Sequence, residues 1–241
     1  MRWVLSVVLM VAAGGAMVGQ QPATTESADA KKIATLEAKV DDFAGLERYK
    51  AADAELAPKE KGRVVFYGDS ITDAWVRNGG KFFPGKPYVN RGISGQTTPQ
   101  MLIRMRQDVI DLHPEAVVIL AGTNDIAGNT GPSTLGMIED NFKSMTELAE
   151  ANHIRVVLAS VLPAADYPWK RGMDPAPKIR ELNAWIKDYC EQKKITYLDY
   201  YSAMVGPDGG MKPGISLDGV HPNAAGYAIM EPLAEQALAK R

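Results

Sequence analysis

The sequence has few cysteines and histidines, and its charges nearly cancel. Its one cysteine, Cys190, has no partner for an internal disulfide, so the fold must depend on an apolar core. Lys and Arg number 27 against 29 Asp and Glu, which gives a formal charge of −2 and excludes the basic surface expected for nucleic-acid binding. Neither a GxGxxG run nor a Walker lysine is present, which disfavours a nucleotide site.

The first residues have the pattern of a secretory signal peptide. In MRWVLSVVLMVAAGGAMVGQ, Arg2 precedes an apolar run, and small residues suited to cleavage follow. The uninterrupted apolar run is well short of the roughly 20 residues that cross a membrane. We therefore expect residues 1–20 to be cleaved from an exported protein, periplasmic or secreted, that has no membrane contact afterwards; a membrane anchor is the alternative.

The remainder suits one main domain preceded by a helical arm. Residues 31–57 place apolar side chains three or four apart, which predicts one helix that ends before Pro58. We interpret residues 21–60 as an arm packed on a domain of residues 61–241, with coiled-coil pairing as the alternative. The apolar residues of this stripe are Ile33, Leu36, Val40, Phe43 and Leu46.

Short apolar runs alternate with helical patterns along residues 61–241. The runs predict strands at 64–67, 88–90, 116–121, 156–160 and 196–198, and the other patterns predict helices at 98–112, 135–151, 178–193 and 223–240. Strands that alternate with helices need crossover connections, which place helices on both faces of a mostly parallel sheet. The predicted fold class is therefore α/β, a three-layer α/β/α sandwich with a five-stranded parallel sheet, and ligands should bind beyond the carboxyl ends of its strands.

The first predicted strand ends in Gly68, Asp69 and Ser70, at the start of a helical pattern. A serine at such a turn exposes its hydroxyl and lies near a helix N-terminus, where developing negative charge is favoured. A Ser or Asp in this position is also commonly no more than a helix cap. The tripeptide alone therefore leaves a nucleophile and a cap as alternatives.

The next two predicted strands also end in polar turns. The second is followed by RGISG, in which Gly95 lets the backbone approach a ligand and offer its N–H. The third is followed by GTND, in which the Asn124 amide is placed to donate to an oxyanion. Each turn alone is ordinary turn chemistry. Because all three lie at one edge of the sheet, together they favour a functional site.

Asp218 and His221 stand three residues apart in a short loop before the last predicted helix. This spacing lets the carboxylate reach one imidazole nitrogen while the other faces outward, as a general base requires. The other histidines, His113 and His153, precede strands and should lie at the opposite edge of the sheet. A metal site is the alternative, but no further His or Cys with ligand spacing accompanies the pair, so we expect neither a metal nor another cofactor.

Four segments in this order, GDSITD, RGISG, GTND and DGVHPN, resemble the four sequence blocks of the SGNH hydrolase superfamily, the GDSL-type esterases and lipases. The resemblance covers about residues 64–235 and implies a flavodoxin-like α/β/α sandwich. It implies that Ser70 is the nucleophile and that Asp218 and His221 complete a catalytic triad. It also implies an oxyanion hole formed by Ser70, Gly95 and Asn124.

Within that superfamily the sequence is most similar to the acetylhydrolase-like branch, which is related to platelet-activating-factor acetylhydrolase subunits and carbohydrate acetyl esterases. The resemblance therefore implies a serine esterase for short acyl groups, foremost acetyl, on small molecules or glycans. A lysophospholipase or thioesterase is one alternative, and a non-catalytic carbohydrate-binding protein with the same fold is another. The sequence does not indicate an oligomeric state.

Several polar and aromatic side chains near the motifs are candidates for substrate contact. Caps, salt bridges and core packing are the alternative roles for such residues. The candidates are Asp69, Arg91 and Trp169, with Trp75, Phe82, Phe83 and Tyr167 as further aromatic platforms.

Overall fold

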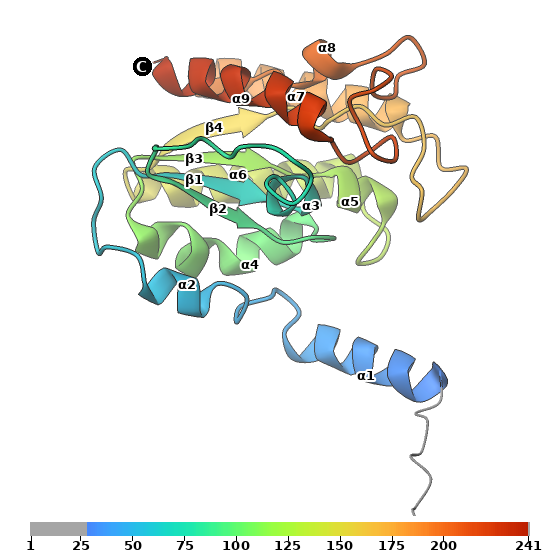
Figure 1. The fold of residues 1–241 in the computed structure, drawn as a ribbon, viewed down its shortest axis with the longest axis horizontal. Helices are drawn as coiled ribbons and strands as arrows, with labels where there is room; N and C mark the ends of the chain where they lie inside the picture. Colours follow the sequence, from blue (N-terminus) through green and yellow to red (C-terminus); the bar gives the residue numbers. More distant parts are fainter. Residues whose placement is uncertain (1–27, 241) are drawn as a thin grey trace, which may run out of the picture. The chain divides into compact units, whose positions relative to one another are not determined.

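The structure is a computed structural model that describes residues 28–240 (Figure 1). The predicted signal peptide, residues 1–20, lies outside the described residues, and export stays a prediction. Within residues 28–240, the residues up to Val40 and those from Asp41 onward belong to two separate compact units. No helix within residues 28–240 has both the length and the apolar character needed to cross a membrane.

The single helix predicted over residues 31–57 is instead two helices, α1 (Ala28–Asp41) and α2 (Lys50–Ala54). A turn separates them because the Asp42 carboxylate accepts hydrogen bonds from the backbone N–H of Leu46, at 2.6 Å, and of the following residue, at 3.1 Å. A continuing helix would direct those N–H groups to carbonyl oxygens four residues earlier, and an acidic side chain that competes for them ends the helix. The apolar pattern continues through this turn, so the predicted helix was too long.

Residues 41–60, assigned above to the arm, lie in the same compact unit as the sheet. Three glutamine side chains donate hydrogen bonds of 2.6–2.7 Å to backbone carbonyl oxygens of this segment. Asp53 of α2 also forms an ion pair with Arg91 in the second strand. These contacts attach the segment to the sheet domain. The donors are Gln96, Gln100 and Gln107, and the acceptors belong to Ala44, Phe43 and Leu46, respectively.

The sheet has five parallel strands in the order β2-β1-β3-β4-β5. This is the order of flavodoxin-like sheets, and it confirms the predicted fold class. Each strand begins and ends within two residues of its predicted span. In β1, β3 and β4, a nearly continuous apolar run marks a strand that is buried on both faces. The strands are β1 (Val64–Gly68), β2 (Tyr88–Gly92), β3 (Ala116–Leu120), β4 (Arg155–Ala159) and β5 (Thr196–Leu198).

Helices cover both faces of the sheet. The main ones are α3 (Ser70–Asp73), α4 (Thr98–Asp108), α6 (Leu135–Ala151), α7 (Ala176–Lys193), α8 (Tyr201–Met204) and α9 (Ala224–Ala239). Successive strand residues point to opposite faces, so Val65 and Tyr67 of β1 pack with α4, α6 and α7, whereas Val64 and Phe66 pack with α3, α8 and α9. In Figure 1, α9 lies above the strands and α4 below them.

Three of the aromatic candidates for substrate contact belong to the core on the α9 side of the sheet. Trp75 and Phe83 are buried, and their ring centroids lie 5.8 and 4.7 Å from that of Phe66 in β1. Phe82 is partly buried and packs edge-on against the same ring at 5.4 Å. These three rings support the sheet, so core packing is the correct interpretation for them.

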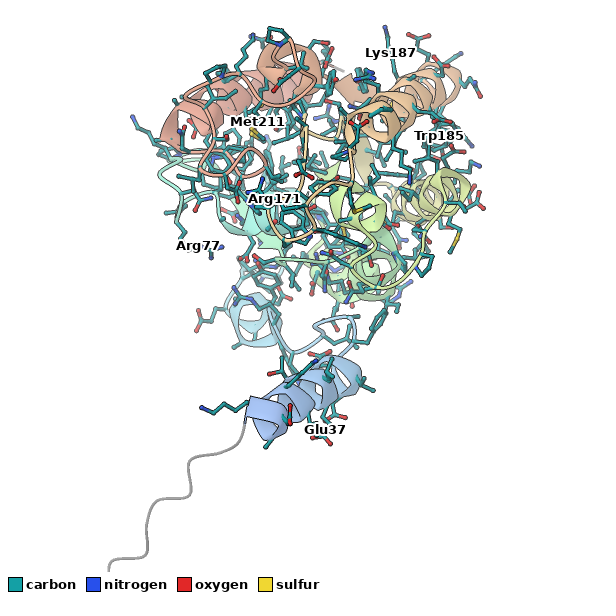
Figure 2. All side chains as sticks on the ribbon, turned by 90° about the vertical axis from the view of Figure 1, so that its right-hand side faces the viewer. Glu37, Arg77, Arg171, Trp185, Lys187 and Met211 are labelled. Atoms are coloured by element: carbon teal, nitrogen blue, oxygen red, sulfur yellow. The ribbon has the colours of Figure 1, made fainter. Side chains whose placement is uncertain are left out.

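The carboxyl ends of β1, β2 and β3 carry the candidate site residues. β1 leads directly into α3, and β3 leads into α5 (Thr123–Ala127). Between the neighbouring strands β1 and β3 the chain order reverses, because β1 is followed by β2 on one side and β3 by β4 on the other. Such a switch point leaves a crevice beyond the strand ends. This edge of the sheet faces the reader in Figure 2.

Candidate active site

Ser70 is the first residue of α3, and the residue before it sets its position. Asp69 caps the helix, since its Oδ1 accepts the backbone N–H of Ile71 at 3.0 Å. The cap fixes the sharp change of direction from β1 into α3. Ser70 therefore stands at the carboxyl edge of the sheet, where its hydroxyl lines a pocket.

Asp218 and His221 lie in a loop that is closed on itself. The backbone N–H of Leu217 donates to the carbonyl oxygen of His221 at 2.8 Å, and the N–H of Gly219 donates to Ser216 Oγ at 3.0 Å. Gly219 has a φ of +89°, a left-handed conformation that costs side chains other than glycine strain energy. The closed loop presents both functional side chains toward α3.

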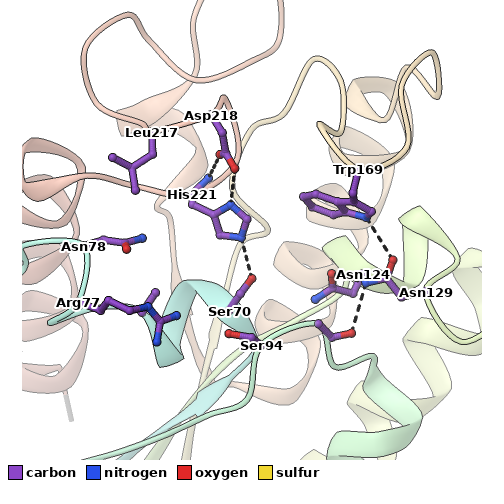
Figure 3. Close-up of a pocket in the computed structure, with 12 residues that line it drawn as sticks. Ser70, Arg77, Asn78, Ser94, Asn124, Asn129, Trp169, Leu217, Asp218 and His221 are labelled. Carbon is purple, nitrogen blue, oxygen red and sulfur yellow. Dashed lines mark hydrogen bonds and ion pairs between the residues drawn. The ribbon is translucent and has the colours of Figure 1, made fainter. Parts of the chain in front are cut away.

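The structure brings Ser70, His221 and Asp218 into one hydrogen-bonded chain (Figure 3). Ser70 Oγ lies 2.9 Å from His221 Nε2, and His221 Nδ1 lies 2.8 Å from Asp218 Oδ2. Asp218 Oδ1 accepts the backbone N–H groups of Val220 and His221 at 3.0 and 2.8 Å. Partial burial alone would raise the pKa of Asp218, but the hydrogen bonds from His221 and Val220 outweigh it and lower that pKa. An ionised carboxylate that holds Nδ1–H leaves Nε2 to accept a proton from the serine hydroxyl.

Gly95 and Asn124 lie beside Ser70, and both line the same pocket. The buried Asn124 amide donates through Nδ2 to the backbone oxygen of Gln96 at 2.9 Å and to Asp69 Oδ2 at 3.2 Å. The longer of these two bonds goes to a carboxylate next to the serine. A negatively charged oxygen formed at Ser70 would compete with Asp69 for this donor, and Gly95 offers a backbone N–H from the neighbouring loop.

Asn129 links the Asn124 amide to Trp169 on the other side of the pocket, and the sequence did not indicate this link. Its Nδ2 donates to Asn124 Oδ1 at 2.8 Å and to the backbone oxygen of Gly95 at 3.3 Å, while its Oδ1 accepts the indole N–H of Trp169 at 3.2 Å. The chain turns back after α5 because Gly128 has a φ of +70° and the N–H of Asn129 bonds to the carbonyl oxygen of Asn124 at 3.0 Å. A glycine directly after a short helix is the one sequence signal for this turn.

The pocket around Ser70 has a volume of about 430 Å³. Trp169 and Leu217 give it apolar surface, and both side chains are substantially exposed. Figure 3 shows Arg77 and Asn78 on one side of Ser70, with Asn124 and Asn129 on the other. The complete lining consists of Ser70, Ala74, Arg77, Asn78, Ser94, Gly95, Asn124, Asn129, Trp169, Leu217, Asp218 and His221.

Of the three candidate substrate-binding residues, Trp169 lines the pocket, whereas Asp69 and Arg91 do not. Arg91 is only 5% exposed, because its guanidinium is paired with Asp53 of α2. Arg91 therefore has the alternative role, a salt bridge, and does not contact the pocket. The sequence could not show this, because nothing in it indicates that α2 packs on β2. Tyr167 is buried beneath Trp169, with the two rings stacked 5.0 Å apart.

We expect Asp69 to make the unfolding of this protein pH-dependent. Burial raises the pKa of Asp69 to about 7. An aspartate in the unfolded chain titrates near roughly pH 3.9, so between these values the folded protein holds a proton that the unfolded chain has lost. Asp69 therefore stabilises the fold most below the unfolded value, and the free energy of unfolding falls as the pH rises toward the folded value, by at most about 1.4 kcal/mol per pH unit.

We expect Asp69→Asn to flatten this pH dependence, since an amide does not titrate. Urea denaturation of both proteins between about pH 4 and about pH 7 measures the two slopes. Burial also raises the pKa values of other carboxyls, such as Asp125 and Asp108. The difference in slope between the variant and wild type therefore gives the contribution of Asp69 alone. Parallel stability curves for the two proteins would contradict the prediction.

The described residues contain no group of three or more His, Cys, Asp or Glu side chains suited to a metal ion. His113 and His153 precede β3 and β4, at the edge of the sheet away from Ser70. Cys190 is buried in α7, and burial raises the pKa of its thiol to about 12, so it stays protonated. The reactive groups gathered at the carboxyl edge are thus a serine, an imidazole, a carboxylate and amide donors.

Known proteins share this fold. Residues 66–229 match the GDSL-like lipase/acylhydrolase family, and the chain belongs to that family. A GDSL-like lipase of known structure from Bacteroides thetaiotaomicron is 50% identical, with a TM-score of 0.79 over 82% of this chain and 98% of that chain. The chain is therefore a carboxylic ester hydrolase, and the predicted resemblance to GDSL-type esterases is confirmed.

Two more distant relatives have different names. The human platelet-activating factor acetylhydrolase IB subunit alpha2 is 26% identical over 187 residues, which are 71% of this chain and 74% of that protein. An N-acylneuraminate cytidylyltransferase from Streptococcus agalactiae is 26% identical over 176 residues, 69% of this chain. The chain spans only 40% of the length of that cytidylyltransferase.

Proposed function

We propose that this ester hydrolase is a serine esterase that removes short acyl groups, foremost acetyl, from small-molecule or carbohydrate alcohols. The observation that carries the proposal is the 2.9 Å contact between Ser70 Oγ and His221 Nε2, with His221 Nδ1 bonded to Asp218. This geometry suits removal of the serine proton by an imidazole whose tautomer the carboxylate fixes.

In the proposed mechanism, Ser70 Oγ attacks the ester carbonyl carbon while His221 Nε2 takes the hydroxyl proton. The carbonyl oxygen becomes an oxyanion that the N–H groups of Ser70 and Gly95 and the amide of Asn124 stabilise. When the adduct collapses, His221 returns the proton to the departing alcohol and leaves an acyl group on Ser70. Water then attacks this acyl-enzyme with His221 again as base, which releases the acid and restores the serine.

The surroundings of Ser70 support a small acyl group. Gly95 and Asn129, which are hydrogen-bonded to each other beside Asn124, place polar atoms on the oxyanion side of the pocket, which suits acetyl better than a long alkyl chain. One relative is named an acetylhydrolase, and another is named for an N-acylneuraminate, an acylated sugar. The exposed Trp169 ring offers a flat surface of the kind on which sugar rings pack.

Rates on p-nitrophenyl esters of increasing acyl length test this proposal. We expect kcat/KM to fall by about tenfold or more from acetate to octanoate, because a long alkyl chain would have to lie against the polar atoms of Gly95 and Asn129. A fluorophosphonate should label Ser70 covalently, with the labelled peptide found by mass spectrometry. Equal or faster hydrolysis of octanoate would favour a lysophospholipase or thioesterase. Inertness toward all esters, without labelling, would favour a non-catalytic carbohydrate-binding protein.

A further inference from the structure

Arg77 presents an unused guanidinium to the pocket. Its side chain is 62% exposed and lines the pocket near Ser70. Among residues 28–240, the guanidinium has one ionic partner, Asp73, with Nη2 and Oδ2 3.8 Å apart, and no hydrogen bond. Figure 2 shows the Arg77 side chain at the surface, and Figure 3 shows its guanidinium directed toward Ser70. Five N–H donors are therefore available to a bound molecule.

The charge of Arg77 is not cancelled by its neighbours. The Asp73 carboxylate also pairs with Arg48 at 3.5 Å and accepts the hydroxyl of Ser94, so two guanidinium groups share one carboxylate. The other carboxylate at the pocket belongs to Asp218, and both of its oxygens accept hydrogen bonds from the loop that holds it. The pocket thus has an excess of positive charge on the Arg77 side.

Arg77 lies on the side of Ser70 where the alcohol of an ester would be held. Asn124, one of the proposed oxyanion donors, is on the opposite side of the serine from Arg77 in Figure 3. His221 must return a proton to the departing alcohol, so that alcohol must extend from the imidazole and away from the oxyanion donors. The groups around this space are Arg77, Asn78 and Leu217.

We propose that Arg77 recognises an oxoanion, carboxylate or phosphate, on the alcohol portion of the ester, so that the preferred substrates are acyl esters of acidic alcohols. The planar guanidinium fork matches such oxoanions through paired, charge-assisted hydrogen bonds. This inference rests on the proposed esterase function and names its substrate class.

Matched aryl acetates test the proposal without a natural substrate. We compare kcat/KM for 3- and 4-acetoxybenzoate with kcat/KM for the acetoxybenzamide of the same substitution, which has the same shape and no charge. The corresponding acetoxyphenyl phosphates form a second arm, and the better of the two anions identifies the oxoanion. For wild type we expect a preference for one anion over the amide of about tenfold, carried mainly by KM.

Arg77→Gln should reduce this preference to near one. Arg48→Gln is the matched control. It removes a guanidinium that pairs with the same Asp73 carboxylate, but Arg48 does not line the pocket. The control should keep the wild-type preference within about twofold, since a surface charge outside the pocket has a weak, screened effect. Thermal unfolding of both variants checks that they fold.

An unchanged preference in Arg77→Gln, an equal loss in Arg48→Gln, or no anion preference in wild type would overturn the inference. These three results count against the inference only if the protein hydrolyses p-nitrophenyl acetate. Inertness toward that ester, with Ser70 unlabelled by a fluorophosphonate, would instead remove the esterase function and this inference with it. The two failures are therefore distinguishable.

Discussion

Replacement of Ser70 by alanine is expected to lower kcat toward p-nitrophenyl acetate by a factor on the order of 10⁴ to 10⁶. The Ser70 hydroxyl oxygen lies 2.9 Å from the imidazole Nε2, and in the proposed mechanism no acyl-enzyme can form without it. Steady-state kinetics measures the loss, and labelling by a fluorophosphonate should disappear with it. Any remaining activity would come from direct attack of water on the ester, which the pocket still binds.

Two further variants make this result specific. His221→Ala should cost a similar factor, and the double variant should be no slower than either single one, because the two groups act as one unit. Ser144→Ala is a matched control, since that hydroxyl bonds to the Asp140 backbone on the exposed side of α6, away from the pocket. A Ser70→Ala protein with more than about one tenth of wild-type kcat would refute the nucleophile assignment.

Replacement of Asn124 by alanine is expected to reduce kcat by about 10²- to 10³-fold with a much smaller change in KM. An oxyanion donor acts on charge that exists only in the transition state, so its removal spares ground-state binding. Removal of the amide also leaves Asp69 Oδ2 and the Gln96 carbonyl oxygen without this donor, so some loss of stability should accompany the loss of rate.

The split between kcat and KM separates an oxyanion donor from a structural amide. Asn152→Ala provides the control, because that side chain bonds to the Leu148 carbonyl on an exposed helix end. Near wild-type turnover by Asn124→Ala would exclude this amide from the oxyanion hole. A rise in KM with unchanged kcat would assign Asn124 to substrate binding instead.

The sheet and its order of elements follow from local pattern. Buried parallel strands are nearly continuous apolar runs bounded by polar turns, and β1, β3 and β4 have that form. The edge strands β2 and β5 include polar residues, yet the ends of all five strands were predictable to within two residues. The functional residues at the strand ends were predictable for the same reason. Parallel strands bring their carboxyl ends to one edge, which places Ser70 and Asn124 together without any knowledge of distances.

Features that depend on specific contacts in the folded structure could not be predicted from the sequence. The break between α1 and α2 comes from one carboxylate, Asp42, that competes for backbone donors within an otherwise periodic pattern. Arg91 was ambiguous because its partner, Asp53, lies 38 residues earlier in the chain. Asn129 and Arg77 have no motif of their own, and their positions in the pocket follow only from the turns after α5 and α3.

The hydrogen bond between Ser70 and His221 joins residues 151 positions apart, and this separation has a consequence for biosynthesis. A growing polypeptide contains the serine long before the imidazole is made, and contacts of such range form late in folding because they close a long loop. A partly synthesised or unfolded chain thus has the hydroxyl without the imidazole. If the proposed mechanism holds, ester cleavage begins only when α9 and the loop before it have docked, so the enzyme is inactive until its assembly is complete.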